Sequence, residues 1–198
     1  KGKLVALNNA MANFTSNEDA VGTDTIIYSV NDGKQGSDTA TITITKATLT
    51  ITADDQSIIY GEPNVSLTYT VEGTNYNNEV IVTTEREAGD TVGTYNITAS
   101  ASDSNYDITL VSGTYEITKA TYDMSEISLD DSSFVYDSEN HDLAISGTLP
   151  EGVTVSYTNN GQSDVGEYTV TASFSGDSTN YNAIPDETGT ITITASTI

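Results

Sequence analysis

Neighbouring carboxylates are the side chains best suited to metal chemistry in this chain, and such pairs include Asp54-Asp55, Asp130-Asp131 and Asp186-Glu187. The first two pairs lie at similar places, shortly after a Lys-Ala step. This repetition points to a calcium ion at each module junction, since calcium takes about six to eight oxygen ligands from carboxylates and carbonyls. The alternative is an exposed acidic turn, which the lack of an Asp-x-Asp-x-Asp-Gly loop favours. A glycosidase would need two carboxyl groups facing each other across a cleft.

Catalysis by histidine or cysteine has little support. His141 is the only histidine, lies between Asn140 and Asp142, and is expected to be a loop residue. One histidine excludes a His-rich metal site and supports no Ser-His-Asp arrangement. The chain has no cysteine, no phosphate-binding Gly-Lys-Ser/Thr loop and no dinucleotide fingerprint. We therefore predict no enzyme activity, no catalytic or cofactor-binding residue and no required cofactor.

Two lysines could take part in a covalent cross-link. Lys46 and Lys119 end equivalent alternating segments, and some pilus and adhesin modules join a buried lysine to an asparagine by an isopeptide bond. Residues 120–198 contain no lysine, so that bond cannot form there. The simpler interpretation of Lys119 is a solvated lysine that protects a strand edge against aggregation.

Tyrosines are the remaining candidates for ligand contacts, since an aromatic face can stack on the C–H groups of a sugar. Six of them recur in two module frames, which fits core and turn roles: Tyr60, Tyr95 and Tyr106 correspond to Tyr136, Tyr168 and Tyr181. The better ligand candidates are the less repeated ones, Tyr69, Tyr76 and Tyr157. Three asparagines also head Asn-x-Ser/Thr sequons, which matter only in a host that glycosylates: Asn13, Asn64 and Asn96.

The elements that carry these side chains are repeated. Residues 42–47, 115–120 and 191–195 read ITITKA, YEITKA and ITITA, at spacings of 73 and 76 residues. A fixed period predicts a tandem array, with an incomplete module at 1–46 and two full modules at 47–119 and 120–198. Each full module is near the lower size for independent folding, so neighbours are expected to support each other. The junctions lack a Gly/Ser or Pro linker, which predicts limited bending and an elongated chain.

Alternating runs rich in threonine and tyrosine predict strands, because both residue types favour the pleated sheet. The runs lie at 25–30, 39–45, 48–52, 66–71, 80–84, 94–99, 114–118, 153–158, 167–174 and 190–194. Asn160-Gly161, between two of them, predicts a short-loop hairpin. Many short strands at such spacing predict an all-β chain of tandem small β-sandwich modules in an elongated array.

The two full modules also align inside their boundaries. VGTYNITAS at 92–100 aligns with VGEYTVTAS at 165–173, and Asn105-Tyr106 aligns with Asn180-Tyr181. The change from Ile97 to Val170 keeps an inward position apolar, as a core-facing alternation requires. The Asp-x-Gly-x-Tyr run that ends at Tyr168 resembles the start of a late strand in immunoglobulin-type sandwiches, where the tyrosine hydroxyl bonds back to the turn.

The charge restricts the partners. The chain has 29 Asp and Glu against 6 Lys and Arg, for a net charge of −23, and residues 120–198 carry no Lys or Arg. Such a surface repels phosphate backbones, so no nucleic acid partner is expected. No run of about 18 apolar residues is present, and no direct membrane insertion is expected. The acidity and the lack of cysteine fit an extracellular location, at a bacterial cell surface or cell wall.

The motifs carry a resemblance to known repeats. Residues 47–119 resemble the MBG domain of the YGX type, through LTITA at 49–53, IYG at 59–61, VGTY at 92–95 and YEITK at 115–119. Residues 120–198 resemble a sister type, through FVYD at 134–137, LPEGV at 149–153 and VGEY at 165–168, with Ser138 where glycine is expected. Residues 1–46 resemble the C-terminal part of a cadherin-like bacterial repeat, through GTDTIIY at 22–28 and NDG at 31–33. The resemblance implies immunoglobulin-like or β-grasp-like modules of a long adhesin or cell-wall protein.

Four functions fit these observations, the last of them an accessory module of a secreted hydrolase. The leading one is a structural stalk or spacer in a bacterial cell-surface adhesin-type protein, whose partners are neighbouring modules of the same chain. The second is a module that binds a host glycan or surface protein through its loops at 73–79, 85–91 and 176–187. The third is a subunit of an extracellular filament, assembled by strand addition to the incomplete segment 1–46.

Overall fold

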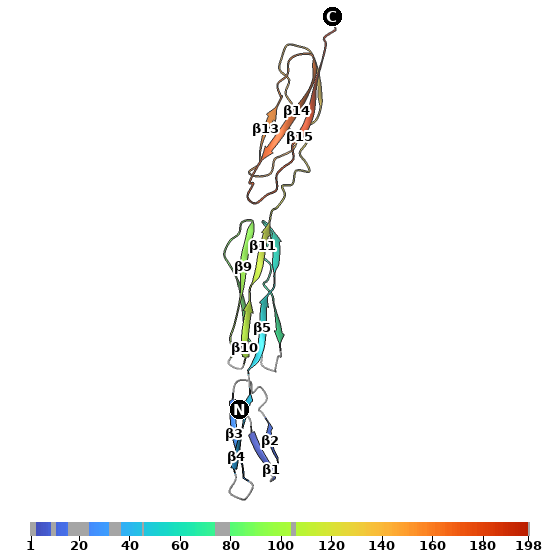
Figure 1. The fold of residues 1–198 in the computed structure, drawn as a ribbon. Coiled ribbons are helices and arrows are strands. Elements are labelled where there is room, and N and C mark those ends of the chain that lie inside the picture. The colour runs from blue at the N-terminus through green and yellow to red at the C-terminus, as the bar shows by residue number, and fades with distance from the viewer. Residues whose placement is uncertain are drawn as a thin grey trace. The chain divides into compact units, whose positions relative to one another are not determined.

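The computed structural model describes residues 3–8, 11–15, 24–31, 37–44, 46–73, 80–103 and 106–197. These residues form fifteen β-strands, and the described part of the chain contains no helix (Figure 1). Accordingly, nothing among the described residues has the helical length and hydropathy that a membrane span requires. The predicted all-β fold class is confirmed.

The chain divides into two compact units. The first comprises residues 1–57, 64–89 and 94–116, and the second comprises 58–63, 90–93 and 117–198. The second unit therefore includes two short segments that precede residue 117 in the sequence. The predicted module boundaries at 46/47 and 119/120 stay predictions.

The N-terminal part of the first unit contains two antiparallel pairs. Strand β1 (Lys3–Asn8) pairs with β2 (Met11–Thr15), and β3 (Asp24–Asn31) pairs with β4 (Ser37–Ile44). The strands expected at 25–30 and 39–45 correspond to β3 and β4, apart from residue 45, which lies outside the described residues.

Two further sheets follow. One has the order β10 (Tyr106–Val111), β5 (Ala47–Ala53) and β7 (Tyr69–Gly73), with β10 parallel and β7 antiparallel to β5. The other has the order β6 (Gln56–Ile59), β11 (Gly113–Thr118), β9 (Gly93–Ala101) and β8 (Val82–Arg86).

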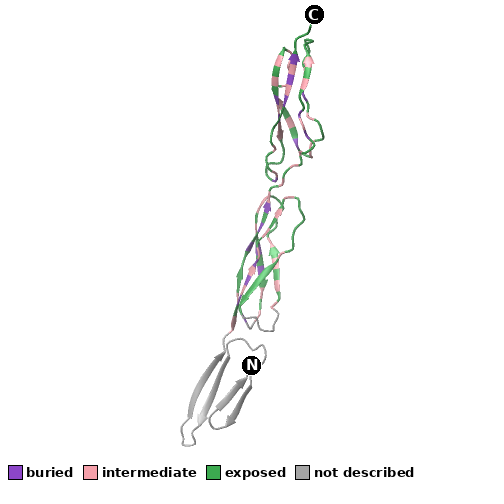
Figure 2. Cartoon of the chain, turned by 90° about the vertical axis from the view of Figure 1, so that its right-hand side faces the viewer, coloured by how far each residue is buried: buried purple, intermediate pink, exposed green. Residues whose placement is uncertain are grey.

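Alternate side chains of these strands form the core. Burial alternates along β5, β9 and β11, which is the consequence of side chains pointing to opposite faces of a strand (Figure 2). The largest fully buried side chains here are Leu49, Ile51, Ile97 and Tyr115. Each side chain of this kind contributes about 1.5–3 kcal/mol on leaving water.

The last sheet lies within the second unit. Its order is β12 (Ser132–Val135), β15 (Glu187–Thr194), β14 (Gly166–Ser175) and β13 (Thr154–Thr158), with β12 parallel to β15 and the other pairs antiparallel. One face carries the core residues Val170, Ala172, Ile191 and Ile193, covered by Leu129 and Leu143 from the connecting segments. The alternate positions carry serine and threonine, so the pleat separates an apolar face from a hydroxyl-rich one.

The same hydrogen bonds occur in both predicted modules. The Tyr60 N–H donates to the Thr118 carbonyl at 2.9 Å, and the Tyr136 N–H donates to the Thr194 carbonyl at 2.9 Å. The hydroxyls of these two threonines donate to the carbonyls of Ile58 and Phe134, each at 3.1 Å. Ile97 and Val170 both have 0 % exposure, as their alignment predicts. The structure thus supports the module alignment read from the sequence.

The short loop predicted for a hairpin at Asn160-Gly161 is wrong. The last antiparallel pair of β13 and β14 is Thr158 with Thr171, so the connection is much longer than a two-residue turn. The Asn160 side chain accepts from the Leu143 N–H and donates to the Leu143 carbonyl, both at 2.8 Å. The side-chain amide thus pairs with a backbone segment far away in sequence, and this long-range pairing replaces the local turn.

Candidate functional site

A buried asparagine lies at the centre of a group of polar contacts in the second unit. Asn180 is 7 % exposed. Its Oδ1 accepts from the Val92 N–H at 3.0 Å, its Nδ2 donates to Asp177 Oδ2 at 2.7 Å, and its carbonyl accepts from the Ala120 N–H at 3.0 Å. A buried amide group is costly unless it is paired. Here both ends of the side chain have partners, so its orientation is fixed.

Asp177 holds the loop that presents Asn180. Its Oδ1 accepts from the N–H groups of Thr179 at 2.9 Å and Asn180 at 3.2 Å, a turn stabilised by an aspartate side chain. The hydrogen bond from the Asn180 side chain, the Thr179 N–H and the positive charge of Lys119 lower the pKa of Asp177 below its usual 3.8. The carboxylate is therefore ionised across the neutral and mildly acidic range.

Three tyrosines pack beside this loop. The Tyr122 and Tyr181 rings are stacked, with centroids 4.0 Å apart and an interplanar angle of 14°. The Tyr60 ring meets Tyr181 edge-on, at 5.6 Å and 75°. The Tyr122 hydroxyl accepts from the Asp177 N–H at 2.9 Å. We name Tyr60, Val92, Tyr122, Asp177, Asn180 and Tyr181 the tyrosine–asparagine cluster.

The cluster joins segments that are distant in sequence. It connects the short pieces 58–63 and 90–93 of the second unit to the loop at 177–182. Lys119 adds a further bond, from Nζ to the Ser178 carbonyl at 2.6 Å. Lys119 is exposed, but it follows β11, which lies between β6 and β9, so the predicted role of guarding a strand edge is wrong. Its ammonium group is bound to this loop instead. The arrangement can hold backbone segments together, and its groups are oriented toward one another.

Sequence reasoning identified only part of this cluster. The Asn-Tyr step at 180–181 was recognised as a repeat feature, and the loop at 176–187 was considered as a binding loop. The roles of Val92, Tyr122 and Asp177 were not foreseen. Tyr60 and Tyr136 are predicted in core or turn roles; for Tyr136 the core role is wrong, since it is 40 % exposed, and its hydroxyl accepts from the Ser138 hydroxyl at 3.3 Å beside a bend. Both lie just past a short strand, where alternation no longer reports burial.

The paired carboxylates serve strand ends in the structure. Asp55 Oδ1 accepts from the Thr114 N–H at 2.7 Å and from its hydroxyl at 2.9 Å, and Asp131 Oδ1 accepts from the Thr190 N–H at 2.7 Å. The two bonds from Thr114 lower the pKa of Asp55; the bond from its N–H is the larger cause and the bond from its hydroxyl is the second. Among the described residues, no three His, Cys, Asp or Glu side chains gather as metal ligands would. Calcium at the junctions stays a prediction.

His141 has a structural setting. Its Nε2 lies 3.0 Å from Asp137 Oδ1, and its ring stacks on Phe134 with centroids 4.1 Å apart. Its backbone pairs with Gln162. The pKa of Asp137 is lowered, mainly by the Glu139 N–H and also by His141. The expected loop position of the histidine is confirmed, and the loop is tied to the turn at 159–162.

The remaining tyrosines occupy several settings. The Tyr168 hydroxyl donates to the Asp164 carbonyl at 3.2 Å, which confirms the predicted bond back to the turn. The Tyr157 hydroxyl accepts from the Ile145 N–H at 2.9 Å and its ring packs on the core, so it is poorly placed for a ligand. Tyr69 is 42 % exposed on β7. Tyr76 lies outside the described residues.

The sequons are also placed in part. Asn64 is exposed, and its Oδ1 accepts from the Tyr115 hydroxyl at 3.1 Å. Asn96 is exposed on β9. Asn13 lies in β2. Nothing in the structure assigns glycosylation to them.

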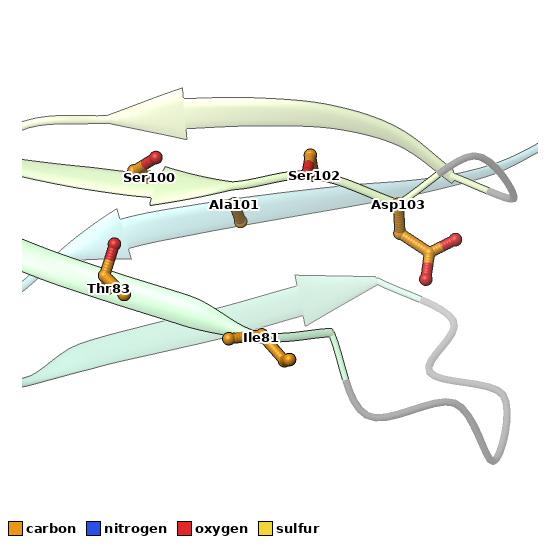
Figure 3. Close-up of a pocket in the computed structure, with 6 residues that line it drawn as sticks. All are labelled: Ile81, Thr83, Ser100, Ala101, Ser102 and Asp103. Carbon is orange, nitrogen blue, oxygen red and sulfur yellow. The ribbon is translucent and has the colours of Figure 1, made fainter.

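The surface hollows are shallow. One of about 400 Å³ lies between the start of β8 and the end of β9, beside Ile81, Thr83, Ser100, Ala101, Ser102 and Asp103 (Figure 3). Figure 3 shows Ile81 and Thr83 beside the segment that carries Ser100, Ala101 and Ser102, with the Asp103 carboxylate at one end of that segment. A second, of about 330 Å³, is lined by Glu85, Arg86 and Asn96 among others. The Arg86 guanidinium lies over the Tyr115 ring at 4.7 Å and donates to the Gly89 carbonyl at 2.6 Å, which orders the expected binding loop at 85–91.

Comparison with solved structures gives three distant likenesses. The chain is 10 % identical to Drosophila N-cadherin EC1-3, with a TM-score of 0.29, covering 98 % of this chain and 86 % of that one. It is 7 % identical to protocadherin Gamma B7 extracellular domains 1-4 (TM-score 0.28; 88 % and 58 %). It is 8 % identical to BT4661, a SusE-like surface located polysaccharide binding protein from Bacteroides thetaiotaomicron (TM-score 0.29; 98 % and 35 %). These likenesses are too distant to assign a function.

Comparison with curated proteins and with protein families completes the picture. No curated protein matches the chain. Residues 1–45 match the bacterial Ig domain, where the sequence resemblance was to a cadherin-like repeat. Residues 49–116 match the MBG domain of the YGX type, as their motifs predict. Residues 1–45 are thus similar to a bacterial Ig domain and residues 49–116 to an MBG domain of the YGX type, and similarity to these two domain types suggests a bacterial cell-surface protein.

Proposed function

We propose that this chain is a structural spacer within a bacterial cell-surface protein. The observation that carries the proposal is the tyrosine–asparagine cluster, in which Asn180 and Tyr181 hold Val92 and Tyr60. The last strand of the MBG domain continues into Ala120 without a linker, and the Ala120 N–H is bonded to the Asn180 carbonyl. Backbone and side-chain bonds of this kind resist local opening, because each contributes about 0.5–1.5 kcal/mol net of the water that would replace it.

The candidate chemical groups support the same proposal. Asp55, Asp131 and Asp177 accept hydrogen bonds from backbone N–H groups, and His141 is stacked and bonded within its loop. These hydrogen bonds and the ring contact stabilise strand ends and turns. The acidic surface keeps such a segment solvated and disfavours self-association.

A screen against glycans and host surface proteins tests the spacer function. The full chain, displayed at a defined density, is expected to show no binding above a matched acidic β-protein. Saturable binding that survives physiological salt would contradict a pure spacer. Its dependence on Tyr69 would then identify the surface involved, with Tyr157→Phe as the control for a core tyrosine.

A binding role has one observation in its favour. Every residue of β7 is exposed, and this strand lies at the edge of its sheet. Tyr69 and Val71 pair in register with Ala53 and Ile51, so they belong to the core face yet are each 42 % exposed. An open edge with exposed apolar side chains can accept an added strand from a partner. Loss of binding in Tyr69→Ala, with unchanged thermal stability, would support this second function.

A further inference from the structure

The two predicted modules, 47–119 and 120–198, each have one end that is closed by the same hydrogen bonds. Tyr60 follows β6 and Tyr136 follows β12, and their N–H groups donate to the carbonyls of Thr118 and Thr194 at the same distance, 2.9 Å. The hydroxyls of these threonines donate to the carbonyls of Ile58 and Phe134, each at 3.1 Å. Val92 and Val165 occupy matching places immediately before β9 and β14, which begin at Gly93 and Gly166. The first end uses Tyr60 and Val92, and the second uses Tyr136 and Val165.

The two ends differ in what covers them. Tyr60 packs edge-on against Tyr181, and the Val92 N–H donates to Asn180. Their counterparts are open to solvent, with Tyr136 40 % and Val165 53 % exposed. The difference is specific to these positions, because the neighbouring pair Ile59 and Val135 is exposed at both ends, at 52 % and 59 %.

We propose that Tyr136 and Val165 form a docking surface for a further β module that presents a loop like the one at 177–182. The docked loop would place a tyrosine against the Tyr136 ring and an asparagine Oδ1 on the Val165 N–H. The proposal rests on the spacer function, since it extends the contact that carries that function. It assigns a partner to a surface that the chain leaves uncovered.

The occupant follows from the chemistry of the covered end. The aromatic and amide part of that contact consists of two rings, one amide and one backbone N–H and needs no opposite charges, although Lys119 adds a positive charge that acts on Asp177 at the covered end. It can therefore form between two acidic modules, where an ion-pair interface could not. A second copy of this chain is a poor occupant, because its own Asn180 and Tyr181 are already engaged by Val92 and Tyr60.

The partner module must therefore supply a loop of its own, and its first residues must bond to that loop as Ala120 bonds to Asn180. The Ala120 N–H bonds to the Asn180 carbonyl immediately after Lys119, so docking and chain continuity go together. One contact would be missing at the second end. Lys119 donates to the Ser178 carbonyl, whereas its counterpart is Ala195, which has no donor in its side chain.

An extended chain tests the proposal. Residues 121–198 are repeated directly after Ser196 of the full chain, and amide hydrogen exchange is measured at Val165 and Val92. We expect the Val165 amide to exchange roughly tenfold more slowly in the extended chain than in the original one. Tyr136→Ala in the extended chain should remove that protection. Tyr60→Ala is the matched control, and should act on Val92 while leaving Val165 protected.

Each outcome decides between the two proposals. An unprotected Val165 beside a protected Val92 overturns the docking surface and leaves the spacer function standing. Protection that does not depend on Tyr136 also overturns it, since the added copy then acts elsewhere. An unprotected Val92 contradicts the spacer function as well. In a second extension, residues 119–198 are repeated after Thr194, which restores the lysine contact. If the Val165 amide is unprotected in this extension as well, the proposal is overturned, even if the first extension folds poorly.

Discussion

The Asn180 Oδ1 accepts a hydrogen bond from the Val92 N–H at 3.0 Å, although 88 residues separate them in sequence. Both residues belong to the second compact unit. The bond connects the turn before β9 to the loop before β15, and Asp177 fixes the other end of the amide. A short segment of the region that matches the MBG domain is thereby held by the loop at 177–182.

Removal of the Asn180 side chain should destabilise the second unit. Asn180→Ala leaves the Val92 N–H and one Asp177 oxygen without their partner, which costs about 1–3 kcal/mol for a group at this depth. Chemical denaturation measures the loss. Asn182→Ala is the control, because its exposed Nδ2 bonds only to the Thr121 hydroxyl, and it should change stability by less than about 0.5 kcal/mol. Equal effects of the two substitutions would contradict the assigned role.

The aromatic packing should depend on the ring of Tyr181 and not on its hydroxyl. Tyr181→Ala removes contacts with both Tyr60 and Tyr122, and aromatic pairs contribute about 0.5–1.5 kcal/mol each beyond their buried area. Tyr181→Phe keeps both rings in contact and should leave the melting temperature nearly unchanged. Thermal unfolding of the two variants checks this, and a Phe variant as unstable as the Ala variant would refute the stacking argument.

Ser138 occupies a backbone conformation suited to glycine. Its φ is +70°, a left-handed value that costs a non-glycine residue about 1–2 kcal/mol. Ser138→Gly should therefore stabilise the chain. The gain is reduced by the larger conformational entropy of glycine in the unfolded chain and by the loss of the weak bond from Ser138 to the Tyr136 hydroxyl at 3.3 Å. The measurement is the denaturation midpoint. Ser133→Gly in strand β12 is the opposite control and should destabilise by roughly 0.5–1 kcal/mol.

Asp55 should contribute stability that is lost in acid. Hydrogen bonds from Thr114 lower its pKa in the folded chain below the usual 3.8. A lowered folded pKa gives stability that is fully present above the usual value and disappears as the pH falls through the folded pKa. The melting temperatures of wild type and Asp55→Ala should thus differ most at neutral pH and converge below about pH 3.8. A gap that stays constant with pH would show that the charge plays no part.

Much of the fold could be predicted from the sequence, because the alternation of apolar and hydroxyl side chains reports which face of a strand is buried. That alternation identified Ile97 and Val170 as equivalent core positions, and both are fully buried. The strands β6 and β12 were missed because each has only four residues, too few for a clear period. The Tyr168 bond to its turn was predicted because both partners lie in one motif.

The cluster itself could be predicted only in part, for a physical reason. Asn180 stood out as a repeated residue, but its function depends on Val92, and no local pattern connects residues so far apart. The carboxylate pairs suggested calcium because oxygen ligands were close in sequence. In the structure one carboxylate oxygen of Asp55 and of Asp131 accepts from the N–H group of Thr114 and Thr190, each 59 residues away, and calcium stays a prediction. Long-range partners of this kind decide what a polar side chain does.

The most direct test of the account is amide hydrogen exchange at Val92 in the unmodified chain, compared with Asn180→Ala. If the tyrosine–asparagine cluster carries the spacer function, the Val92 amide should exchange about as slowly as the core amides of residues 120–198. In the variant it should exchange much faster, while those core amides keep their protection. A Val92 amide that exchanges at the rate of an open loop in the unmodified chain would contradict the central claim.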